Sequence, residues 1–121
     1  MYSIVFERRT RTLQLTLEGL WTGATLAGLT AELLVTTKAA RLHGTFAILS
    51  DSTRFAVQQR DVAEGFTRLM AQGAKAHQGP TAIVVASVLN KLQVERTMAS
   101  PRLAVFLSLA DARAWLARQE Y

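Results

Sequence analysis

Cysteine is absent from this chain of 121 residues, and its absence excludes a disulfide framework and any thiolate site. The absence also favours a reducing compartment. The first residues, MYSIVFERR, hold only a short apolar stretch before a charge, which is not the pattern of a secretory signal. The most hydrophobic long segment, 20–35, contains glycines and Glu32 and is too short and too polar to cross a bilayer. We therefore expect a cytoplasmic protein with no transmembrane segment.

The motifs of common catalytic sites are missing as well. The sequence has no G-x-S-x-G, no phosphate-binding P-loop and no G-x-G-x-x-G. Its two histidines, His43 and His77, have no cysteines or clustered carboxylates to complete a metal site. A serine nucleophile needs a base and an oxyanion hole, and neither histidine is adjacent in sequence to a serine-rich segment. We therefore expect no enzyme activity, cofactor or metal. The alternative is a small hydrolase or transferase that uses a serine at the tip of a strand.

Positive charge is in excess, with a net charge of +5 at pH 7. Such a charge is compatible with binding to nucleic acid or to an anionic membrane. The arginines are dispersed singly, apart from the cluster of Arg8, Arg9 and Arg11, and no motif that reads RNA or DNA accompanies them. Dispersed charges are typical of solvated helix faces, so we do not expect a nucleic-acid partner.

Strands and helices alternate along the chain. The segment 12–19, TLQLTLEG, alternates leucines with polar residues, which predicts a half-buried strand. A short basic link joins it to a first strand over 3–9 as a hairpin. Leucines at spacings of three and four predict a helix over 22–41, which Gly44 is suited to terminate, and a strand over 45–50 follows.

The next helix is predicted from a capping-box pattern, Asp61-x-x-Glu64, with an apolar stripe behind it. We expect this helix to end near Gly73 and to be followed by a loop over 74–80. Trp115, on the Ala-rich terminal helix, is expected to dock that helix onto the sheet.

Two later segments, 82–86 (AIVVA) and 103–107 (LAVFL), are apolar on both faces, which is typical of parallel strands packed by crossover helices. Each leads into a serine and a predicted helix. Ser87 precedes one helix, and Ser108-x-x-Asp111 is a second capping box. Alternating strands and helices predict an α/β domain of order ββαβαβαβα, with a mostly parallel sheet and an antiparallel first strand.

Four stretches carry a resemblance that covers nearly the whole chain: LTLEGLWTGATL, FAILSDSTRF, TAIVVASVLNKLQVER and VFLSLADARAWLA. In this order they resemble the SpoIIAA-like (STAS/Sec14-like) family of small bacterial proteins. The resemblance implies a STAS-like βα superhelix, a single domain over 1–121 and no established reaction. Better-understood STAS relatives are anti-anti-sigma factors switched by serine phosphorylation, and the broader fold includes Sec14-like lipid carriers.

The phosphorylation switch of those relatives lacks an acceptor here. Asp51 resembles the family's strand-end aspartate, and the phosphoserine would then fall within 57–61, VQQRD, which has no Ser, Thr or Gly. Ser50, Ser52 and Thr53 lie earlier in the chain. A phosphorylation-switched anti-sigma factor antagonist therefore remains an alternative, and we expect Asp51 and Ser52 to bond backbone donors in a turn.

A binding groove is the interpretation that we favour. In parallel α/β sheets, ligands bind outside the carboxyl ends of the strands, where helix N-termini offer free N–H groups. We predict a non-enzymatic binding or regulatory module that takes a protein partner or a small apolar, lipid-like or anionic ligand at this edge. The candidate residues are Trp21, Thr22, Ser50, Asp51, Ser52, Arg54, Phe55, Ser87 and Ser108. For Ser87 and Ser108 the alternative is plain helix capping.

Self-association is also expected. The strands over 82–86 and 103–107 need cover on both faces, either from helices on both sides of the sheet or from a second subunit. Because C₂ homodimers are the commonest soluble assembly, we predict a homodimer.

Overall fold

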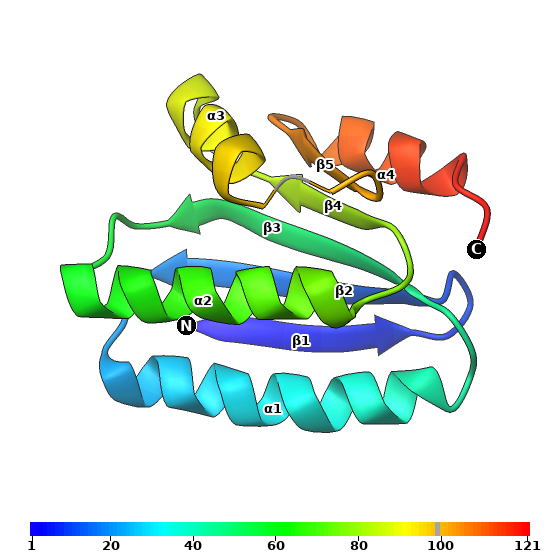
Figure 1. Cartoon of the computed structure of the whole chain (residues 1–121), viewed down its shortest axis with the longest axis horizontal. Coiled ribbons are helices and arrows are strands. Elements are labelled where there is room, and N and C mark those ends of the chain that lie inside the picture. The colour runs from blue at the N-terminus through cyan, green and yellow to red at the C-terminus, as the bar shows by residue number, and fades with distance from the viewer. Residues whose placement is uncertain (99) are drawn as a thin grey trace.

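The computed structural model describes residues 1–98 and 100–121 and contains one five-stranded sheet with helices on both faces (Figure 1). The strands are β1 (Tyr2–Glu7), β2 (Thr12–Gly19), β3 (Ala47–Phe55), β4 (Thr81–Val84) and β5 (Leu103–Phe106), and the helices are α1 (Gly23–Arg41), α2 (Arg60–Ala76), α3 (Val88–Thr97) and α4 (Leu109–Ala117). The strands lie in chain order; β1 pairs antiparallel with β2, and the other neighbours pair in parallel. The predicted α/β fold of order ββαβαβαβα is confirmed.

One face of the sheet is covered by α1, α2 and α3. Leu15 of β2, Ser50 of β3 and Ile83 of β4 are partners in the strand register, so they point to this same face. Leu15 packs with Leu29 of α1 and Val62 of α2, whereas Ile83 belongs to a smaller cluster under α3. The leucine side of the alternating segment predicted over 12–19 is therefore the buried side.

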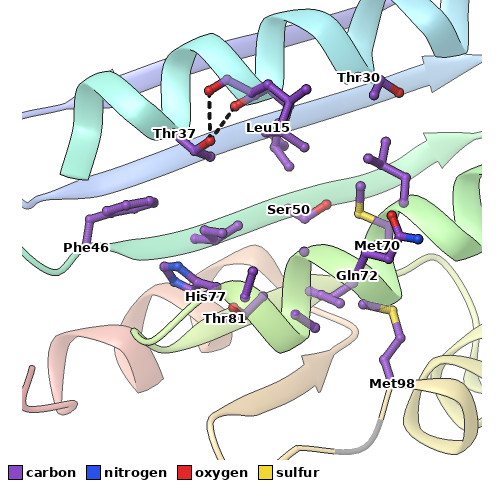
Figure 2. Close-up of a pocket in the computed structure, with 18 of the residues that line it drawn as sticks. Leu15, Thr30, Thr37, Phe46, Ser50, Met70, Gln72, His77, Thr81 and Met98 are labelled. Carbon is purple, nitrogen blue, oxygen red and sulfur yellow. Dashed lines mark hydrogen bonds between the residues drawn. The ribbon is translucent and has the colours of Figure 1, made fainter.

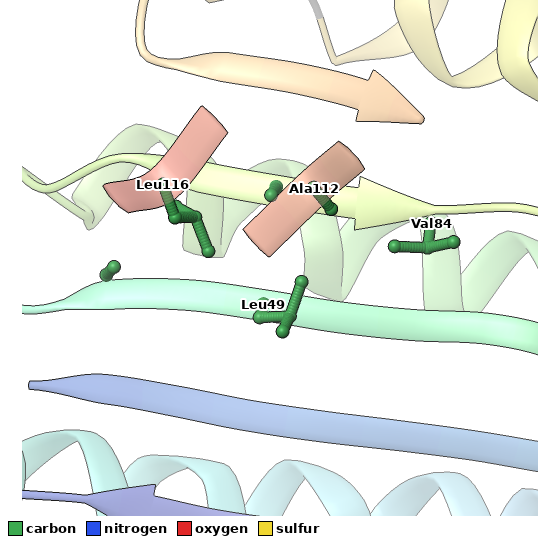
Figure 3. Packing of buried hydrophobic residues seen from close by; sticks show 6 residues of the cluster. Leu49, Val84, Ala112 and Leu116 are labelled. Atoms are coloured by element: carbon green, nitrogen blue, oxygen red, sulfur yellow. The ribbon is translucent and has the colours of Figure 1, made fainter. Parts of the chain in front are cut away.

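On the opposite face, α4 packs over β3, β4 and β5. Leu49 of β3 and Val84 of β4 meet Ala112 and Leu116 of α4 in a buried cluster (Figure 3). Central strands that are apolar on both faces thus receive cover from helices of their own chain. No helix among residues 1–98 and 100–121 combines the length and the apolar character needed to cross a membrane.

Three helices begin at a capping hydroxyl. Thr22, Ser87 and Ser108 are the N-caps of α1, α3 and α4, and each side-chain oxygen accepts a hydrogen bond from the backbone N–H three residues later, at 3.2–3.3 Å. Each bond satisfies a backbone donor that has no partner inside the helix. The sequence placed these three helix starts correctly.

The prediction for β3 was wrong at its end. Asp51, Ser52, Arg54 and Phe55 are strand residues rather than turn residues, because pairing with β2 continues past an irregularity near Thr16 and reaches Phe55. Ser52 Oγ donates to the backbone carbonyl of Val84 in β4 at 2.8 Å, and Asp51 Oδ1 accepts from the backbone N–H of Thr53. Backbone pairing therefore outweighs the local turn preference of the Ser-Asp-Ser cluster.

The prediction for α2 was wrong at both ends. Its N-cap is Gln59, which makes no side-chain capping bond, and the proposed capping box is absent because Asp61 bonds the next backbone N–H while Glu64 pairs with Arg60 at 3.1 Å. Gly73 lies inside the helix, which continues to Ala76. The backbone N–H of His77 still donates to the Gly73 carbonyl, so the glycine does not terminate the helix.

Candidate functional site

A cavity of about 260 Å³ lies between α1 and α2, with the sheet as its floor (Figure 2). Most of its lining is apolar and comes from both helices and three strands. Leu15, Leu33, Ile48, Leu69, Met70 and Ile83 form much of the wall. Because ligand sites are concave and mostly apolar, a partly open, apolar hollow of this size above the sheet is a candidate ligand site.

The cavity exists because α2 presents small side chains to it in its last turns. Gly73, Ala74 and Ala76 line the space where larger apolar residues would fill it. Across the cavity, Thr30 and Thr37 of α1 each donate a hydroxyl hydrogen bond to the carbonyl four residues earlier, at 2.9 and 2.8 Å. Figure 2 shows Thr37 making this bond. Because these hydroxyls are satisfied within the helix, the threonines contribute a wall with little free hydrogen-bonding capacity.

Two polar side chains, Ser50 and His77, are buried against this cavity. The His77 ring is 4.8 Å from the ring of Phe46, and its Nε2 atom has no hydrogen-bond partner among the described residues. Burial lowers the pKa of His77, and the positive charges of Arg102 and Arg41 lower it further. The imidazole is therefore neutral at pH 7, and its Nε2 atom is buried beside the loop that carries Gly79.

A second cavity, of about 540 Å³, adjoins the first one. Arg41, Phe46, Ala76 and His77 line both spaces. The loop that follows α1 and the loop that follows α2 complete the second cavity. In the part of the chain that the structure describes, no group of three His, Asp or Glu side chains is placed to hold a metal ion.

Two aromatic candidates from the sequence lie in the core. Trp21 is 2% exposed, its ring contacts that of Phe55 edge to face at 4.8 Å, and its indole N–H donates to the carbonyl of Glu18. Phe66 of α2 completes this aromatic cluster. Trp21 and Phe55 therefore hold α1 and α2 on the sheet and do not form the wall of a groove at its edge.

The polar candidates do not converge on one surface. Ser50 and Asp51 are consecutive strand residues, so Ser50 faces the cavity while Asp51 points to the opposite face of the sheet. Ser87 and Ser108 open helices on opposite faces. Arg54 is exposed and lies 3.7 Å from a Glu18 carboxylate oxygen. The two serines and Thr22 act as the helix caps described above, and a site at the carboxyl edge of the sheet stays a prediction.

Sequence patterns did not single out the cavity. His77 stood as a lone histidine in a predicted loop, and Arg41 as one of many dispersed arginines. A signal was present in the run of small residues over 71–76, AQGAKA, which follows the apolar stripe of α2. Ending the helix at Gly73 assigned half of that run to a loop, so its effect on helix packing was not visible.

A solved structure shares this fold. An uncharacterised protein of the DUF3478 family from Shewanella loihica PV-4, described as having a SpoIIAA-like fold, matches with a TM-score of 0.71. The two chains are 21% identical, and the match covers 95% of this chain and 93% of the other. No family model and no curated protein matches the sequence. The fold is therefore SpoIIAA-like, as the resemblance implied, and a likeness at this identity establishes the fold alone.

Proposed function

We propose that the protein is a non-enzymatic, cytoplasmic binding module of the SpoIIAA-like type that takes a small apolar ligand into the cavity between α1 and α2. The observation that carries this proposal is the 260 Å³ space, whose lining is mostly apolar.

The size of the cavity supports a small ligand. An engineered cavity of about 150 Å³ holds benzene, and sites for drug-sized ligands span about 300–1,000 Å³. The space between α1 and α2, at about 260 Å³, falls between these limits. A ring system or a short acyl chain matches it in volume and in polarity.

Two other functions have less support. Ser52 Oγ donates to the carbonyl of Val84, and the hydroxyls of Ser87 and Ser108 accept capping bonds. Across the described residues, no histidine or lysine side chain is hydrogen-bonded to these serines or to Ser50, as a serine hydrolase or transferase would need. An antagonist switched by phosphorylation would need a hydroxyl at the start of α2, where the sequence VQQRD has none.

Ligand-observed NMR with two simple probes, 1-octanol and octanoate, tests the proposal. We expect at least one probe to bind the wild-type protein and to lose binding in Ala74→Leu, because the larger side chain fills the cavity. Ala114→Leu, at an exposed position of α4, is the matched control and should bind as the wild type does. Failure of both probes to bind, or full binding by Ala74→Leu, would contradict the proposal.

We also propose that the protein forms a homodimer, now for a reason different from sheet cover. Val88, Leu89 and Leu92 of α3 are more than half exposed and lie on one side of the helix, at spacings of one, three and four residues. An exposed apolar cluster of this kind supports self-association.

A further inference from the structure

We propose that the ligand is an amphipathic anion, a short carboxylic acid in its ionised form, whose tail occupies the apolar cavity and whose carboxylate lies in the adjoining cavity beside Arg41. This inference rests on the proposed function and adds the chemical class and the orientation of the ligand. It starts from the contact between the two cavities. They share Arg41, Phe46, Ala76 and His77 in their linings, so they are neighbours, and the proposed ligand would extend from one into the other.

The two cavities differ in character. The first is lined mostly by leucine, isoleucine and methionine side chains, and the hydroxyls of Thr30 and Thr37 in its wall are satisfied within α1. The second is lined in part by loop residues, namely Gly44, Thr45, Gln78 and Gly79. A tail that avoids water therefore favours the first space, and a hydrated head group favours the second.

The charge around the second cavity is positive. Arg41 is in the last turn of α1, lines both cavities and makes none of the ion pairs found among the described residues. Arg102 lines neither cavity, and its Nη2 donates to the backbone carbonyl of His77 at 3.2 Å. No aspartate or glutamate lines either cavity. An anionic head group would find one lining cation, Arg41, and no like charge.

Arg41 also complements the carbonyl end of the α1 dipole, a role that any basic residue in the last turn can fill. Helix stabilisation alone does not require the arginine to line two cavities. A guanidinium at this place presents several N–H donors in a fixed plane, which match the two oxygens of a carboxylate. That match selects a carboxylate over an ammonium or a neutral head group.

The neighbouring loop packs closely against the residue before β3. A Cβ built on Gly79 would lie 2.0 Å from the carbonyl oxygen of Phe46, so the chain after α2 packs tightly against the start of β3. Gly44, on the other side of the second cavity, has a φ of +99°, a conformation that glycine adopts without strain. These two glycines therefore give part of the wall of the second cavity a backbone surface.

The length of the tail follows from the volume. A space of about 260 Å³ holds about eight groups the size of a water molecule, at about 30 Å³ each. Octanoate, with seven carbons beyond its carboxylate, fits this limit, and 1-octanol is its neutral counterpart with the same total number of carbons.

Isothermal titration of the full chain with octanoate, 1-octanol and octylammonium tests the inference. We expect octanoate to bind the wild-type protein about tenfold more tightly than 1-octanol, the effect of one charge-assisted hydrogen bond at the exposed Arg41, and octylammonium to bind most weakly. Arg41→Gln should remove the preference for octanoate over 1-octanol, because the neutral amide makes no charge-assisted hydrogen bond. Arg113→Gln, an exposed arginine on α4, is the matched control and should keep the preference.

The outcomes separate this inference from the function on which it rests. Equal affinities for octanoate and 1-octanol in the wild-type protein would overturn the carboxylate assignment while leaving a ligand cavity in place. A preference that survives in Arg41→Gln would overturn the role of Arg41 in the same way. Absence of binding by all three probes would instead overturn the proposed function itself. The comparison of probes on the wild-type protein stays decisive if Arg41→Gln does not fold.

Discussion

Close backbone contact at Gly79 gives the clearest test at the scale of single residues. A Cβ there would lie 2.0 Å from the Phe46 carbonyl oxygen, whereas a Cβ on Gly73, inside α2, would have no atom within 4 Å. We expect Gly79→Ala to lower the free energy of unfolding by about 1–3 kcal/mol, as overpacking does. Gly73→Ala should raise it by about 0.5–1 kcal/mol, because alanine is the better helix former. Urea denaturation measures both, and a change of the same sign in the two variants would contradict this account.

His77 makes stability depend on pH. Burial, followed by the charges of Arg102 and Arg41, lowers its pKa below the ordinary 6.5, while the carbonyl groups of Pro80 and Phe46 act in the opposite direction. Between the folded and unfolded pKa values the unfolded chain binds more protons, so stability rises with pH in this window. The contribution of neutral His77 to the free energy of unfolding is complete above about pH 6.5, and it is lost as the pH falls toward the folded pKa.

We therefore expect the free energy of unfolding to fall between pH 7.5 and 5.5 in the wild-type protein and to change less in His77→Gln. Equilibrium denaturation at intervals across this range measures the two slopes. The exposed His43 is present in both proteins and serves as an internal control. Equal slopes would show that His77 is not the titrating group.

At the scale of helices and strands, the two tryptophans differ in burial. Trp21 is 2% exposed within an aromatic cluster, whereas Trp115 of α4 is only half-buried, with its ring 5.8 Å from that of Phe106. We expect Trp21→Ala to cost about 3–5 kcal/mol, the range for a fully buried aromatic ring. Trp115→Ala should cost less, about 1–3 kcal/mol, because the ring is only partly removed from water. Chemical denaturation compares them, and an equal or larger loss for Trp115→Ala would contradict the burial argument.

The elements that sequence predicted well are those whose signals are local and agree with one another. The alternating leucines of β2, the leucine spacing of α1 and the hydroxyl caps of α3 and α4 each needed only nearby residues. The end of β3 could not be read in this way, because SDSTRF has the composition of a turn and becomes a strand only through pairing with β2. The prediction for the end of α2 was wrong for a related reason. Glycine commonly terminates helices, but in the packed protein the helix continues beyond Gly73 to Ala76.

At the scale of the whole molecule, the order of elements follows from the sequence and the position of the cavity does not. Strand order and helix placement result from apolar patterning and from the handedness of crossovers, which are properties of each segment. The cavity arises from a mismatch between the small residues at the end of α2 and the space left by α1, which is visible only once the two helices are packed. Arg41 and His77 come together for the same reason, although 36 positions separate them in the sequence.

Self-association is the remaining prediction at this scale. Helices of the same chain cover both faces of the central strands, so an uncovered sheet no longer argues for a dimer. The exposed side chains of Val88, Leu89 and Leu92 on α3 argue for a dimer instead, and a stable interface around them would bury at least about 1,000 Å².

We expect light scattering at micromolar concentration to give about twice the 13.3 kDa of one chain. Leu92→Glu should shift the mass toward that of a monomer, because association would bury an unpaired charge. Val57→Glu, at a position 95% exposed outside α3, should leave the dimer intact. A wild-type mass of one chain across the dilution range would rule out the dimer, and dissociation by Val57→Glu alone would place the interface elsewhere.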